Sequence, residues 1–157
     1  MQIKQKAKQA RILTYLGTLP FWGCLTAIAF GIELNNAAPA WGAIAHSYAV
    51  IIISFLAGIH WALFMSQSYK MNLFIVSNVF ALIGWFSLLD VGGPVGLTSC
   101  AGLFGLLFII DRRLKNDGLI SDFFYKTRRK ASVAVISILL AIAALVEFSC
   151  LCSAMPV

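Results

Sequence analysis

Residues 43–66, AIAHSYAVIIISFLAGIHWALFMS, contain no Asp, Glu, Lys or Arg over 24 consecutive positions. At 1.5 Å per residue, a helix of this length covers about 36 Å, and the hydrocarbon core of a bilayer is about 30 Å thick. A membrane-spanning β-strand needs only about 9–11 residues and alternates apolar with polar positions, which this stretch does not do. The stretch therefore predicts a membrane-spanning helix.

The composition extends this prediction to the whole chain. Of the 157 residues, 61% are hydrophobic and 11% are charged, and the mean hydropathy is +0.89. A soluble domain has about 25% charged residues. These figures exclude a water-soluble globule, a disordered chain and a soluble nucleic-acid-binding protein, and four cysteines are too few for a disulfide-rich secreted domain. The chain is predicted to be an integral membrane protein.

Four further apolar stretches raise the number of predicted spans to five. The spans are predicted at about 12–31, 43–66, 71–90, 92–110 and 131–151. Short breaks rich in turn-forming residues, such as Gly92-Gly93-Pro94, separate neighbouring spans and indicate antiparallel helix pairs. The predicted fold is all-α: one membrane domain, residues 1–157, that is a bundle of five transmembrane helices.

The basic residues predict the orientation of this bundle. All 12 Lys and Arg residues fall in the N-terminal tail, at Lys70 or within 111–130, and a five-span arrangement puts these segments on one side. Because Lys and Arg resist translocation, the N-terminus is predicted to be cytoplasmic and the C-terminus outside. As an alternative, the first span and Ala27-Ile28-Ala29 resemble a cleavable secretory signal. Cleavage would leave the other four spans oriented as before.

Residues 111–130 form the most basic connection. Leu119, Ile120, Phe123 and Phe124 share one helical face, so the connection is interpreted as an interfacial helix on the cytoplasmic leaflet or as a solvated loop. Cations at a membrane surface attract anionic lipids rather than nucleic acid. The candidate lipid head-group residues are Arg112, Arg113, Lys126, Arg128, Arg129 and Lys130.

His60 is the deepest ionisable residue in the predicted spans. It lies six residues from the cytoplasmic end of its span, about 9 Å below the surface. Ionisable groups in spans are costly and are candidates for function. Polar residues predicted at the same depth on other spans are Thr18, Ser77, Asn78 and Ser137. This layer has two interpretations: hydrogen bonds that join helices, or a site that relays protons or binds the head of a lipid or quinone-like molecule.

The outer side is predicted to be acidic, because Glu33, His46, Asp90 and Glu147 lie near helix ends without Lys or Arg. A weak alternative to plain solvation is a divalent metal centre of Glu33, His46 and Glu147. No cofactor is predicted. Bis-histidine haem needs two facing imidazoles, whereas His46 and His60 lie about 21 Å apart along one helix. The alternative is a pair formed by His60 of two copies of the chain.

The cysteines are predicted to be mainly structural. Cys24 and Cys100 fall inside spans and are interpreted as small buried hydrophobic residues. Cys150 and Cys152 end the last span, and a disulfide or redox pair between them is the alternative.

One stretch resembles a known family. Residues 48–61, YAVIIISFLAGIHW, resemble the domain of unknown function 3429 membrane family, which includes the animal transmembrane protein 69. Leu19-Pro20-Phe21 and Asp111-Arg112-Arg113 are similar to further motifs of that family, and the resemblance covers roughly residues 12–145. It implies a small multi-pass protein of bacterial inner membranes, or of mitochondria in animals, with no established activity. The resemblance adds Trp61 to His60 as a candidate ligand-binding residue.

No catalytic motif appears in the sequence. We therefore expect a non-enzymatic protein that acts through interaction, as a scaffold or assembly helper, with other membrane proteins or a second copy of itself. The alternative is a binding site for a lipophilic small molecule, or a proton relay, around His60.

Overall fold

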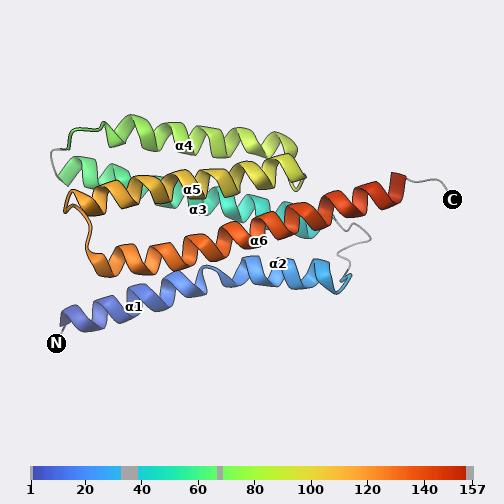
Figure 1. Cartoon of the computed structure of the whole chain (residues 1–157), viewed down its shortest axis with the longest axis horizontal. Coiled ribbons are helices and arrows are strands. Elements are labelled where there is room, and N and C mark those ends of the chain that lie inside the picture. The colour runs from blue at the N-terminus through green and yellow to red at the C-terminus, as the bar shows by residue number, and fades with distance from the viewer. Residues whose placement is uncertain (1, 33–38, 67–68, 155–157) are drawn as a thin grey trace.

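The computed structural model describes residues 2–32, 39–66 and 69–154, and these residues are helical apart from short turns. The elements are α1 (Gln2–Leu16), α2 (Leu19–Ala29), α3 (Pro39–Ser66), α4 (Leu73–Ser87), the 3₁₀ turn η1 (Leu88–Asp90), α5 (Pro94–Asn116) and α6 (Asp122–Ala154). The described part of the chain contains no β-strand. Figure 1 shows the helices running side by side along the long axis of the molecule.

Five segments are long and apolar enough to cross a membrane. They are Ala7–Ala29, Trp41–Ser66, Leu73–Asp90, Pro94–Asn116 and Asp122–Leu151. The prediction of an all-α, multi-pass membrane protein with five spans is therefore confirmed over the described residues.

The first span is broken into two helices at Gly17 and Thr18. Pro20 lies in the first turn of α2, where its missing N–H is no loss. The carbonyl of Gly17, at the break, accepts a hydrogen bond of 3.0 Å from the Tyr48 hydroxyl of α3. Thus a side chain of a neighbouring helix supplies a hydrogen bond to a backbone carbonyl at the break.

The core lies where α2, α3, α5 and α6 meet, and α4 packs outside α3 and α5. Many buried positions carry small residues, among them Ala45, Ala49, Cys100, Ala101 and Ala143. Small side chains let helix backbones approach closely, which is the main source of packing energy between helices in lipid.

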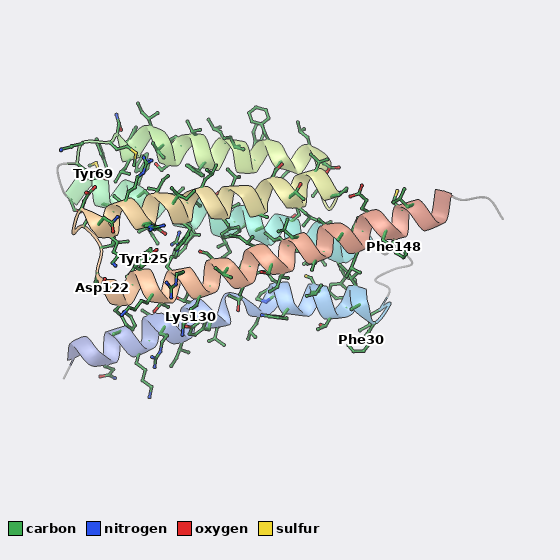
Figure 2. The ribbon with its side chains drawn as sticks, in the orientation of Figure 1. Phe30, Tyr69, Asp122, Tyr125, Lys130 and Phe148 are labelled. Carbon is green, nitrogen blue, oxygen red and sulfur yellow. The ribbon has the colours of Figure 1, made fainter. Side chains whose placement is uncertain are left out.

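The two ends of the bundle differ in charge. We call one of them the basic end: it carries the start of α1, the ends of α3 and α5 and the starts of α4 and α6 (Figure 1). All 12 Lys and Arg residues belong to these segments or flank them. Figure 2 shows Tyr69, Asp122 and Lys130 toward this end, and Phe30 and Phe148 toward the opposite end.

Of the two interpretations of 111–130, an interfacial helix or a solvated loop, the structure contradicts the first, because it has no separate helix within these described residues. The helix α5 continues to Asn116, and α6 begins at Asp122 and runs on through the whole span. The break between them is short because Gly118 adopts a positive φ of 77°, which favours glycine. The Ser121 hydroxyl then accepts a hydrogen bond of 3.3 Å from the Phe124 N–H and so caps α6.

Candidate functional site

Three ionisable side chains from three helices meet near the basic end. His60 lies six residues before the end of α3, Asp111 five residues before the end of α5, and Arg128 six residues after the start of α6. The three residues therefore lie at a similar depth. Their exposed fractions are 1%, 2% and 7%, respectively. We call these three residues the buried triad.

Asp111 is the central member of the buried triad. His60 Nε2 lies 2.9 Å from Asp111 Oδ1 and forms a hydrogen bond with it. Arg128 Nε lies 3.2 Å from Asp111 Oδ2. That second contact is an ion pair without hydrogen-bond geometry. With Asp111 as a carboxylate, which can only accept, His60 Nε2–H is the donor of this hydrogen bond.

The buried triad has hydrogen-bonding capacity left over. His60 Nδ1 and Arg128 Nη2 are buried and have no hydrogen-bond partner among the described residues. In folded proteins about 90% or more of buried polar groups are paired, so an exception requires an explanation. The charges of Asp111 and Arg128 compensate each other, and removing either partner of a buried pair costs about 3–5 kcal/mol. The triad thus contains one pair of opposite charges and is unsaturated in hydrogen bonds.

A cavity of about 430 Å³ adjoins the buried triad and includes Arg128 in its wall. Residues of α1, α2, α3, α5 and α6 line it, and its inner wall contains the buried side chains of Phe21, Phe104 and Val135. Leu13 and Phe55 also line the cavity, yet each is 67% exposed on the surface of its span. The cavity therefore opens sideways, toward the surrounding lipid.

The polar residues predicted to share a layer with His60 are not joined to it. Asn78 and Ser137 are exposed, and the Asn78 amide donates to the Phe74 carbonyl of its own helix. Thr18 and Ser77 are buried, but each hydroxyl donates to a carbonyl three residues earlier. Within the described residues, no hydrogen bond links any of these four to His60; Thr18 alone lines the cavity.

Trp61, the other candidate ligand-binding residue, lies at the surface. It is 42% exposed and stacks on Phe74 of α4 with a ring-centroid distance of 4.4 Å. Trp61 is not among the residues that line the cavity. It therefore packs α3 against α4 and meets lipid.

The predicted lipid head-group residues divide into two groups. Arg128 is buried and pairs with Asp111, so its assignment to the surface is wrong. The reason is its position in the helix: Arg128, Ala131, Ser132 and Val135 are all buried, and this i, i+3, i+4, i+7 pattern marks one helical face. The remaining five are exposed, namely Arg112, Arg113, Lys126, Arg129 and Lys130.

His46 lies toward the opposite end of α3 and is fully buried, at 0% exposed. Its Nδ1 accepts a hydrogen bond of 3.1 Å from the Gly92 N–H, so Nε2 carries the ring proton and donates to the Ser87 hydroxyl at 2.9 Å. Gly96 permits this arrangement, because a Cβ there would lie 2.4 Å from His46 Cε1. The expectation of an exposed His46 in an acidic mouth is therefore wrong.

The predicted outer metal centre is not assembled by the described residues. Glu147 is exposed, His46 is enclosed as described above, and Glu33 lies outside the described residues. Across 2–32, 39–66 and 69–154, no three His, Cys, Asp or Glu side chains gather as metal ligands would.

The cysteines follow the prediction where it can be compared with the structure. Cys24 and Cys100 are buried. The side chain of Cys152 lies outside the described residues, so the Cys150–Cys152 pair stays a prediction.

The buried triad was only partly anticipated. The sequence singled out His60, but it placed Asp111 in the basic connection 111–130 and Arg128 among the candidate lipid head-group residues. The structure shows their common depth: counted from the ends of the helices, the three residues stand six, five and six positions inward.

Comparison with known proteins identifies a family. A family model described as "Protein of unknown function (DUF3429)" matches residues 6–145. No curated protein and no solved structure matches the chain.

Proposed function

The chain belongs to the family described as protein of unknown function (DUF3429), and because that description names no activity, we propose a function from the site itself. The protein is a non-enzymatic, multi-pass membrane protein that binds a lipophilic small molecule in the cavity beside the buried triad. The observation that carries this proposal is a mainly apolar cavity that opens to lipid and includes a buried arginine.

The size and lining of the cavity support this function. Its volume of about 430 Å³ falls within the range of about 300–1,000 Å³ that is usual for small-molecule sites. Such sites combine apolar walls with a few polar groups that orient the ligand. Here Phe21, Phe104 and Val135 supply apolar wall, and Thr18, Ser132 and Arg128 supply polar atoms.

The proposed location is the bacterial inner membrane, with the basic end in the cytoplasm. The alternative location is the mitochondrial inner membrane. The five exposed cations named above would there contact anionic lipids. Cysteine substitutions at Lys4 and Lys126, labelled with a membrane-impermeant maleimide, test the orientation. We expect both positions to stay unlabelled in intact cells and to react once the membrane has been permeabilised. Labelling of the two positions from opposite sides would contradict the proposal.

The interaction or assembly role stays a prediction and ranks second. Its basis is the absence of catalytic motifs in the sequence, whereas the cavity gives the ligand-binding role a specific location.

Ligand binding is tested by photolabelling the wild type and a variant in which a large side chain fills the cavity. The protein is reconstituted in phosphatidylcholine vesicles with hexadecanol, hexadecanoate or hexadecyl phosphate, each carrying a photoreactive diazirine on the chain. We expect saturable labelling of cavity residues by at least one probe in the wild type. Ser132→Phe places a large side chain at a buried position in the cavity wall and is expected to abolish that labelling.

Ser137→Phe is the matched control, because Ser137 lies on the exposed side of the same helix. It should label like the wild type. If none of the three probes gives saturable labelling, or if correctly folded Ser132→Phe labels like Ser137→Phe, the proposed function is wrong.

A further inference from the structure

The inference concerns the chemistry of the ligand, and it rests on the proposed function. We propose that the cavity binds an amphiphile with one anionic head group, a carboxylate or a phosphate, and that the head group pairs with Arg128. The apolar chain of the ligand then lies against Phe21, Phe104 and Val135.

The first support is the state of the Arg128 guanidinium. Its Nε edge faces the Asp111 carboxylate at 3.2 Å, while Nη2 is buried without a hydrogen-bond partner in the described part of the chain. Arg128 is 7% exposed and lines the cavity. A guanidinium carries five N–H donors in a planar fork that matches the oxygens of a carboxylate or phosphate. Arg128 therefore combines an unpaired donor with a place in the cavity wall, and a rotation of the side chain would present that donor to an anionic oxygen.

The second support is the charge at this end of the bundle. All 12 Lys and Arg residues lie in or beside the segments of the basic end, whereas Asp111, Asp117 and Asp122 are the acidic residues that the described part of the chain contributes there. The summed field of these charges attracts anions and repels cations. An anionic head group is thus favoured over a cationic one, although Asp111 lies nearby.

The third support is the direction of the cavity. Along α6 the cavity is lined from Phe123 to Val135, and its part from Arg128 to Val135 covers seven residues, about 10 Å toward the middle of the span. The wall becomes apolar and buried in this direction. A ligand held this way has its head at the basic end and its chain toward the bilayer centre, like the lipids of the adjacent leaflet. It can therefore enter between Leu13 and Phe55 without turning over.

The experiment compares the three probes of equal chain length introduced above. In the wild type we expect hexadecanoate or hexadecyl phosphate to reach half-maximal labelling at a concentration about tenfold below that of hexadecanol, because a charge-assisted hydrogen bond is lost in the alcohol. A preference for hexadecanoate alone assigns the head group as a carboxylate. A preference for hexadecyl phosphate alone assigns it as a lipid phosphate.

Two variants test the role of Arg128. The double variant Asp111→Asn/Arg128→Gln removes both members of the ion pair, so that neither is left charged and alone. It is expected to label equally with all three probes. Arg129→Gln, at the exposed neighbouring position, should keep the wild-type preference.

Two results would overturn the inference: equal labelling of the wild type by hexadecanol and by both anions, or an unchanged anion preference in the double variant. The first of these results needs only the wild type, so it can be obtained even if the double variant fails to fold. Loss of the anion preference with saturable hexadecanol binding would leave the proposed function intact. Absence of saturable binding by every probe would contradict the proposed function instead.

Discussion

The two histidines of α3 are equally buried but differ in what surrounds them. His46 has a partner for each ring nitrogen, the Gly92 N–H and the Ser87 hydroxyl, and Gly96 lies against its ring. His60 has a charged partner, Asp111, and a second nitrogen without a hydrogen bond to any described residue. Burial alone therefore does not distinguish the two sites. Hydrogen-bond saturation does: His46 joins helices, and His60 belongs to a network with capacity left for a further group.

The largest expected effect tests the buried charges near His60. Asp111→Asn leaves the Arg128 guanidinium buried without a counter-charge, and we expect a loss of about 3–5 kcal/mol in the free energy of unfolding. Reversible unfolding in mixed detergent micelles measures this loss. Asp122→Asn, which breaks the exposed pair between Asp122 and Lys115, should change stability by less than about 1 kcal/mol. Equal losses of unfolding free energy in the two variants would show that the Asp111–Arg128 pair contributes no more than an exposed ion pair.

The next effect tests the close packing around His46. In Gly96→Ala the new Cβ would lie 2.4 Å from His46 Cε1 and 2.5 Å from the Asp90 carbonyl oxygen. We expect a loss of about 3 kcal/mol, at the upper end for overpacking, in the same unfolding measurement. Gly102→Ala is the matched control, because a Cβ at Gly102 of α5 would meet no atom within 4 Å. A harmless Gly96→Ala would contradict the account of His46 as an enclosed structural residue.

The direct comparison replaces each histidine by glutamine. Both His46→Gln and His60→Gln lose or distort hydrogen bonds, and we expect about 1–1.5 kcal/mol of lost stability for each. Only His60→Gln should also weaken labelling by the anionic photoprobes, because His60 positions Asp111 and through it Arg128. If His46→Gln weakens this labelling as much, the division into a structural and a functional histidine fails.

The smallest effect concerns an exposed polar pair near the same end as His60. The Tyr69 hydroxyl donates to Asp117 Oδ2 at 2.5 Å, and this hydrogen bond to a carboxylate raises the pKa of Tyr69 above its ordinary value of about 10. The stabilisation by this contact is therefore present at neutral pH and is lost as the pH rises through the raised pKa.

Tyrosinate absorbance, with the Tyr69→Phe curve subtracted, measures this titration. We expect the subtracted transition to lie above that of an ordinary tyrosine and to move down in Asp117→Asn. A transition at the ordinary pKa in the wild type would show that the Tyr69–Asp117 contact does not persist in solution.

The fold was predictable from the sequence because the constraint is strong: in lipid, every backbone polar group needs a partner, and long apolar stretches satisfy this as helices. The candidate site was less predictable. Ending the predicted spans at Ile110 and beginning them again at Ala131 placed Asp111 and Arg128 in a loop, although the helices continue past both residues. The periodic burial of Arg128, Ala131, Ser132 and Val135 was a usable signal for Arg128.

The enclosure of His46 was beyond such reasoning. It depends on the turn after η1 reaching the side of α3, so that the Gly92 N–H meets the imidazole ring. The sequence shows that Gly92 and Gly96 are small, but it does not show which helix they approach. The cavity likewise depends on how α1 and α2 are placed against α3 and α6.

The order of the three triad residues along the chain has a consequence for biosynthesis. His60 leaves the ribosome 51 residues before Asp111, which is a few seconds at about 5–20 residues per second. An aspartate or arginine at position 60 would have to enter the bilayer unpaired, at about 2.5–3.5 kcal/mol on the insertion scale, whereas an imidazole can enter uncharged. Asp111 and Arg128 face each other across one helical hairpin, so these two ions can neutralise each other while the nascent protein is still being inserted.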